Sequence, residues 1–133
     1  MPVTRAELQS RIERIEESYE FFLAFAAQGV RDDRESPSSG QLRDALGKMA
    51  TALDGMAAGL TERIRSERLE PSASWQGFCE TLARDADSAL AAVRLVGARA
   101  AISSQVIDNL NASIHLRALL TDLFLLDDLL RDP

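Results

Sequence analysis

Apolar residues recur along most of the chain at alternating steps of four and three residues, which is the spacing of one face of an α-helix. The first run predicts a helix at residues 5–28. It begins after Thr4, which with Glu7 has the spacing of an N-terminal capping box, and it ends before Gly29. Its apolar positions are Leu8, Ile12, Ile15, Tyr19, Phe22 and Ala26.

Residues 29–39 break this pattern. They are polar, charged and interrupted by Pro37, so we expect a mobile loop here. The next run predicts a helix at 40–69, with apolar positions Leu42, Leu46, Met49, Leu53, Met56, Leu60 and Ile64. Gly47, Gly55 and Gly59 lie inside this run, and each costs about 1 kcal/mol relative to alanine in a helix interior. They either form a small-residue ridge that another helix can approach closely, or are tolerated in a flexible helix.

A third run starts after Pro71 and continues, without a clean break, into the end of the chain. An unbroken helix from Trp75 to Arg131 would be about 80 Å long at 1.5 Å per residue. A turn near 97–104, where Gly97 and two serines interrupt the pattern, gives helices at 74–100 and 104–131 instead, and this is our prediction. The alternative is a turn at 109–113, where Asn and Ser side chains compete for backbone hydrogen bonds.

These segments predict an all-α fold: an antiparallel four-helix bundle with coiled-coil-like seams, formed by residues 1–133 as a single domain. With 133 residues the chain can bury a core without a disulfide or a metal ion. Hydrophobic residues make up 46% of the chain and charged residues 27%, which is typical of a globular protein. Aromatic residues are few and helix-forming residues abundant, and both observations disfavour a sheet.

The formal net charge of −6 argues against nucleic acid as a partner and against binding to anionic membranes. No apolar run approaches the roughly 20 residues of a membrane span, because Arg117 and Asp122 interrupt the most apolar part of the chain. The first residues bring charge before any apolar run, unlike a signal peptide. Cys79 is the single cysteine, so the sequence gives no sign of an oxidising compartment. We therefore expect a cytoplasmic protein.

The predicted C-terminal helix has more apolar surface than one face can hold. On a straight helix, Ile107, Leu110 and Ile114 lie on one side, and a group of leucines lies roughly opposite. Burying one leucine contributes about 1.5–3 kcal/mol, so leaving several in water is costly. We therefore predict that this helix forms the interface of a homodimer. The predicted interface residues are Leu116, Leu119, Leu120, Leu123, Leu126 and Leu130.

The only histidine, His115, lies within this helix. The segment 111–123 resembles the phospho-acceptor box of sensor histidine kinases, Ser-His-Glu-Leu-Arg-x-Pro-Leu, in its order of His, Leu and Arg. With Leu116 and Arg117 aligned, Ile114 takes the family's histidine position, His115 the acidic position and Leu119 that of the proline. The resemblance implies histidine phosphotransfer through His115 as an alternative function. The competing interpretation is a surface or interface histidine that makes local hydrogen bonds.

No other set of residues has the spacing of a catalytic or metal-binding motif, and we expect neither a metal ion nor a cofactor. An aromatic group, Tyr19, Phe22, Trp75 and Phe78, indicates an apolar pocket as an alternative, in a protein that binds an apolar ligand, a lipid surface or a granule surface. The leading hypothesis is a non-enzymatic protein–protein interaction module. It would be an adaptor, an assembly factor or a small chaperone-like subunit that forms a homodimer and binds an unidentified protein partner.

Overall fold

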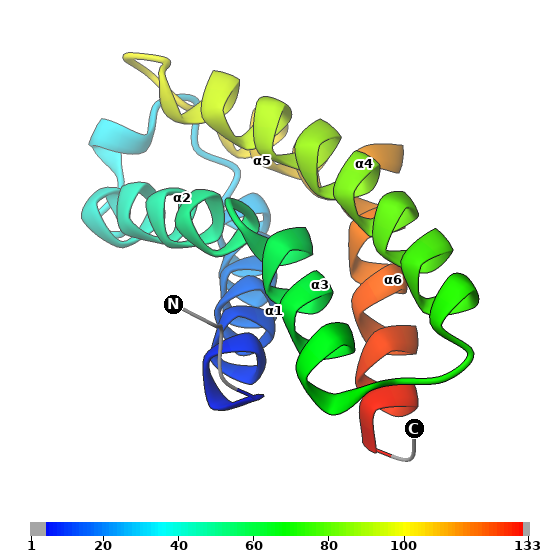
Figure 1. The fold of residues 1–133 in the computed structure, drawn as a ribbon. Helices are drawn as coiled ribbons and strands as arrows, with labels where there is room; N and C mark the ends of the chain where they lie inside the picture. Colours follow the sequence, from blue (N-terminus) through cyan, green and yellow to red (C-terminus); the bar gives the residue numbers. More distant parts are fainter. Residues whose placement is uncertain (1–4, 132–133) are drawn as a thin grey trace.

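The computed structural model describes residues 5–131, and this part of the chain is built of α-helices joined by short connections (Figure 1). The helices are α1 (Arg5–Ala27), α2 (Ser39–Leu53), α3 (Met56–Glu67), α4 (Ser72–Gly97), α5 (Ser104–Ala112) and α6 (Ile114–Arg131), and a 3-10 turn, η1 (Asp33–Glu35), precedes α2. The predicted all-α class is confirmed: between residues 5 and 131 there is no strand. Thr4, the predicted cap of the first helix, lies outside the described residues.

Two of the four predicted helices match single helices to within three residues, α1 and α4. The other two, predicted at 40–69 and 104–131, are each broken in two, so the four uninterrupted helices of the predicted bundle are not observed. Instead α1 packs on α2, α3 and α5, whereas α4 packs on α2, α3, α5 and α6. In Figure 1, α4 runs diagonally along one edge of the molecule, with α3 and α6 on the same side of it.

The break between α2 and α3 lies at Gly55, whose φ of 87° is in the left-handed region that glycine adopts without a steric cost. Arg11 of α1 completes this turn. Its Nη1 donates hydrogen bonds to the carbonyl oxygens of Thr51, Ala52 and Asp54 at 3.1, 3.2 and 2.7 Å. A guanidinium at the C-terminal end of a helix satisfies carbonyl groups that have no helical partner and complements the helix dipole. The apolar spacing continues through Gly55, which is why the sequence predicts a single helix.

The break between α5 and α6 lies at Ser113, within the alternative turn region at 109–113. Its ψ of 142° ends α5, and its Oγ accepts a hydrogen bond from the N–H of Leu116 at 3.3 Å, which caps α6. The predicted turn between the third and fourth helices is also present, between the end of α4 and Ser104. The chain therefore turns at both of the positions that the sequence left open.

This break changes the interpretation of the C-terminal leucines. Because α5 and α6 are separate helices, α5 packs mainly against α1 and buries Ile107, while α6 packs mainly against α4. The six leucines predicted as a dimer interface are all in the core of one chain, with exposures of 0–7%. They are Leu116, Leu119, Leu120, Leu123, Leu126 and Leu130. The premise that a single chain cannot cover them is wrong, because it assumed one straight helix.

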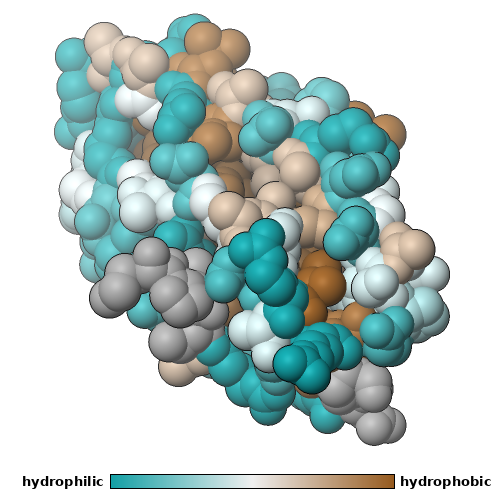
Figure 2. Space-filling model, viewed as in Figure 1, coloured by the Kyte–Doolittle hydropathy of each residue, from teal (hydrophilic) through white to brown (hydrophobic). Residues whose placement is uncertain are grey.

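The core is continuous along the inner faces of the helices and includes the fully buried Phe22 and Phe25 of α1 and Met49 of α2. On the face seen in Figure 1, most of the surface is hydrophilic, and apolar residues gather in a hollow between α3 and α6 (Figure 2). Both of these helices pack on α4.

Asp33 fixes the connection between α1 and α2. Its side chain is fully buried, and its carboxylate accepts hydrogen bonds from Ser39 Oγ at 2.6 Å, Ile102 N–H at 2.9 Å and Arg43 Nε at 3.1 Å. The Arg43 guanidinium also donates to three carbonyl oxygens in the segment 97–100, at 2.7–3.2 Å. Burial alone would raise the pKa of the Asp33 carboxyl, but hydrogen bonds from Arg43, Ser39 and Ile102 outweigh it and hold the pKa well below its usual range.

The expectation of a mobile loop at 29–39 treated every polar residue there as solvated. In the structure this segment contains η1, and Asp33 binds both α2 and the turn that precedes α5. A buried carboxylate must find donors, and here it finds them on two other segments of the chain. At Asp33, therefore, the polar residue forms a buried ionic contact and is not solvated.

Candidate interaction surface

Large apolar side chains lie exposed on the outer side of α6. Ile114 is 76% exposed, Phe124 57%, Leu125 49% and Leu129 39%. At 100° per residue these positions fall within about 140° of each other, roughly opposite the six buried leucines. Together with the other residues of the same sector they form a surface that we call the α6 face. Its members are Ile114, Arg117, Ala118, Thr121, Phe124, Leu125, Asp128 and Leu129.

The exposed apolar side chains of this face carry a substantial cost in water. Full burial of one such side chain contributes about 1.5–3 kcal/mol, so covering the exposed parts of these four contributes roughly 4–5 kcal/mol per chain. Single exposed leucines are ordinary on protein surfaces, whereas a cluster on one helix is typical of a contact site. The sequence therefore predicts an exposed apolar side on the C-terminal helix, where the structure has one, but the residues that it assigns to that side are the leucines of the core.

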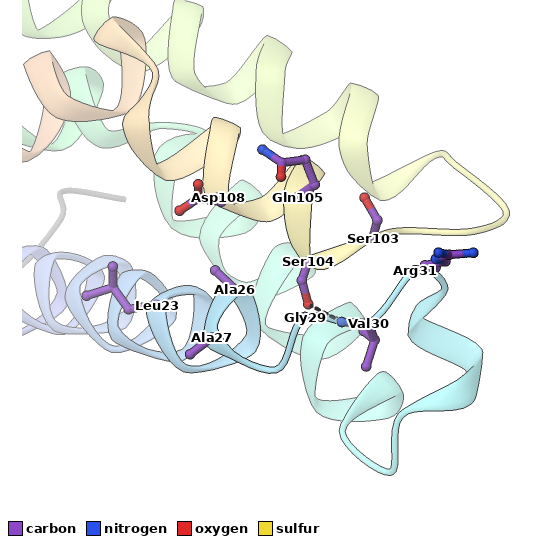
Figure 3. Close-up of a pocket in the computed structure, with 10 residues that line it drawn as sticks. All are labelled: Leu23, Ala26, Ala27, Gly29, Val30, Arg31, Ser103, Ser104, Gln105 and Asp108. Atoms are coloured by element: carbon purple, nitrogen blue, oxygen red, sulfur yellow. Dashed lines mark hydrogen bonds between the residues drawn. The ribbon is translucent and has the colours of Figure 1, made fainter.

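The other large apolar residues that are exposed within residues 5–131 lie on other helices. Leu95 of α4 is 72% exposed, and Leu23 of α1 is 49% exposed. Leu23 lies at an open groove of about 500 Å³ between the end of α1 and the start of α5 (Figure 3). In this view Leu23, Ala26 and Ala27 project from α1 on one side of the groove, and Gln105 and Asp108 project from α5 on the other.

Ser104 closes the inner end of this groove. Its Oγ donates to the carbonyl oxygen of Phe25 at 2.8 Å and accepts from the N–H of Val30 at 3.0 Å, and its own N–H donates to the carbonyl oxygen of Val30 at 2.9 Å. Ser103 caps α5 by accepting from the N–H of Val106 at 3.0 Å. These bonds hold the first turn of α5 against the end of α1, so the groove has a fixed floor.

Two carboxyl groups meet where α6 packs on α4, at the edge of the α6 face. Burial raises the pKa of Asp122 to about 7, helped by a hydrogen bond with Asp85 and by the charge of Asp85. One oxygen of Asp122 is buried without a hydrogen-bond partner within residues 5–131. Near neutral pH this pair holds a proton that two isolated aspartates would release.

The residues of the predicted aromatic pocket lie on two helices, Tyr19 and Phe22 on α1 and Trp75 and Phe78 on α4. Phe22 is fully buried in the second half of α1, and Trp75, 8% exposed, lies in the first turn of α4. Tyr19 and Phe78 are half-buried against the core beside these two residues.

His115, the predicted alternative phospho-acceptor, is an exposed residue in the first turn of α6. Among residues 5–131 no group of three or more His, Cys, Asp or Glu side chains is placed to hold a metal ion. None of the helices in this range combines the length and the apolar content that a bilayer crossing requires.

No protein-family model matches the sequence, and neither a curated protein nor a solved structure is significantly similar to it.

Proposed function

We propose that this chain is a helical protein–protein interaction module that acts as a homodimer and that the α6 face is its contact surface. The observation that carries the proposal is the cluster of exposed Ile114, Phe124, Leu125 and Leu129 on one helix. The contact residues are therefore the outward side chains of α6, in place of the leucines that the sequence predicts.

The expected strength of association follows from the exposed area. Two copies covering each other's α6 face gain roughly 9 kcal/mol from apolar burial, and association costs at least about 4 kcal/mol in lost rotational and translational freedom. The difference of at most about 5 kcal/mol corresponds to a dissociation constant of about 0.2 mM, and polar contacts would lower it. The dimer is thus expected to form and dissociate reversibly, as suits an adaptor or an assembly factor.

Sedimentation velocity or light scattering between about 5 and 500 μM tests the proposal, since this range brackets the expected dissociation constant. We expect the mean mass of the wild type to rise from that of one chain toward that of two across the range. Leu125→Glu should keep the protein monomeric. Leu95→Glu is the matched control, because Leu95 is more exposed than Leu125 but lies on α4. A wild type that stays monomeric, or an equal effect of both variants, would refute the proposal.

A second candidate function is the binding of a small apolar ligand, and it is favoured by the groove between α1 and α5. Its volume of about 500 Å³ lies within the range of ligand sites, and Leu23, Ala26 and Val30 contribute apolar lining. Titration with a fluorescent fatty acid tests this function. Saturable binding that Leu23→Glu abolishes and Leu95→Glu leaves intact would support it. Binding that does not saturate, or that both variants retain, would exclude the groove as the site.

A further inference from the structure

The two halves of the α6 face differ in size and charge. Apart from Ile114 at its start, the first half carries small and cationic side chains, and the second half carries bulky and anionic ones. The residues that make this difference are Arg117, Ala118 and Thr121 in the first half, and Leu125, Asp128 and Leu129 in the second. A surface with such halves is complementary to itself when it is turned end to end.

We infer that the α6 face binds the α6 face of a second copy of this chain in antiparallel orientation, about a two-fold axis that passes near residues 122 and 123. This inference rests on the proposed homodimer and specifies its geometry. In this arrangement the first half of each face contacts the second half of the other.

Charge complementarity supports this register. Arg117 and Asp128 are both exposed and are 11 residues apart, about 16 Å along the helix. Eleven residues make just over three full turns, so both side chains lie along the same side of the face. A two-fold axis midway between them places Arg117 of each copy opposite Asp128 of the other, which gives two identical ion pairs.

The sizes of the side chains agree with the same register. The axis brings Leu125 and Leu129 of one copy over Ala118 and Thr121 of the other, so that bulky residues contact small ones. In a parallel dimer each residue would instead lie beside its own copy. Arg117 would then lie level with Arg117 and Asp128 level with Asp128, so both ion pairs would be lost and each half would face a half of like charge.

Charge reversal tests the ion pairs. Arg117→Asp and Asp128→Arg should each weaken dimerisation about tenfold, because two pairs per dimer become repulsive. The double variant R117D/D128R should restore an affinity close to that of the wild type. Both positions are exposed, and far-ultraviolet circular dichroism will check that each variant keeps its helix content. A double variant as weak as the single variants would overturn the inference.

Disulfide trapping tests the orientation independently. The native cysteine is first replaced by Cys79→Ser, because the serine hydroxyl can keep the contacts that the Cys79 thiol makes with Thr61 and with the carbonyl of Ala57. Under mild oxidation a mixture of R117C chains and D128C chains should form a mixed disulfide dimer, and neither variant alone should cross-link. A disulfide requires Cα atoms within about 7 Å, far less than the offset of about 16 Å in an antiparallel dimer.

The outcomes separate this inference from the proposed function. Efficient cross-linking of R117C alone and of D128C alone would indicate a parallel dimer, which overturns the inference and leaves the homodimer intact. A wild type that dimerises without any of these disulfides would place the contact elsewhere and overturn the inference as well. A wild type that remains monomeric up to about 500 μM would overturn both.

Discussion

Removing the Asp33 carboxylate should destabilise the fold strongly, although Asp33 lies in a connection between helices. Asp33→Ala removes the acceptor for Arg43, for Ser39 Oγ and for the N–H of Ile102. Breaking a buried ion pair by deleting one partner typically costs about 3–5 kcal/mol. The Arg43 side chain is 33% exposed and keeps its carbonyl acceptors in the segment 97–100, so we expect the lower end, about 3 kcal/mol.

Urea unfolding followed by circular dichroism measures this loss, and hydrogen exchange of the Ile102 amide locates it. Asp32→Ala is the control, because the carboxylate of Asp32 binds the neighbouring Arg34 at the surface, and we expect a far smaller change. The pH dependence provides a second readout. The pKa of Asp33 is lowered in the folded state, so its contribution is present above pH about 4 and is lost as the pH falls below that value.

Asp33→Ala should therefore lower the free energy of unfolding at neutral pH and also make it less dependent on pH below about 4. A loss of less than about 1 kcal/mol, with unchanged exchange at Ile102, would refute the reasoning that the buried carboxylate holds these segments together.

The other predictions concern the helices. Because the pKa of Asp122 is raised in the folded state, stability should fall by about 1–2 kcal/mol as the pH rises from about 4 to about 7, and Asp122→Asn should remove this slope in urea titrations across that range. Gly55→Ala should destabilise the fold by about 1–2 kcal/mol, because the φ of Gly55 is positive, whereas Gly47→Ala, at an open helical position of α2, should stabilise it by up to about 1 kcal/mol. Thermal melts of the two variants test this difference, and equal effects would contradict it. Leu123→Ala should lower the unfolding free energy by about 3 kcal/mol because it leaves a cavity in the core, while Leu125→Ala should change the unfolding free energy of the monomer by less than about 1 kcal/mol. Similar losses in urea unfolding would mean that the buried and exposed sides of α6 are wrongly assigned.

The sequence predicts the helical class and most of the core, because apolar spacing reflects burial directly. Leu8, Ile12, Ile15 and Phe22 were assigned to one seam, and all are fully buried. The end of α1 before Gly29 was also predictable, because glycine commonly adopts the positive φ that follows a helix, here 68°.

The breaks were harder to predict, because a turn of one or two residues hardly disturbs a repeat of three and four. At Gly55 the apolar positions on both sides keep their spacing, and the Arg11 side chain that completes the turn comes from a helix about 40 residues earlier. At Ser113 the signal was present, since serine commonly caps a helix, but its strength relative to Gly97 could not be judged.

Whether residues 104–131 form one helix or two also decides which residues lie on the exposed surface. Spacing alone shows that 104–131 has apolar residues on two sides, but it does not show which side is inside. Once Ser113 separates α5 from α6, the leucines at 116–130 fit against the core, and Phe124, Leu125 and Leu129 are left outside. For Asp33, the pattern gave no sign of burial, because its donors lie as far away as Ile102.

The contacts that join the 25–33 region to the start of α5 have a consequence for the order of folding. Ser104 and Phe25 are 79 residues apart, and Asp33 and Ile102 are 69 apart, while α2, α3 and α4 are neighbours along the chain. Closing a loop of this length costs about 4 kcal/mol of chain entropy before its contacts form. We therefore expect the α2–α4 region to collapse early and the docking of α5 to limit the folding rate. During synthesis α1 can pack on α2 and α3 as soon as these helices emerge, but the part of α1 that α5 covers stays exposed until the last quarter of the chain has emerged, which makes that part of α1 exposed to aggregation.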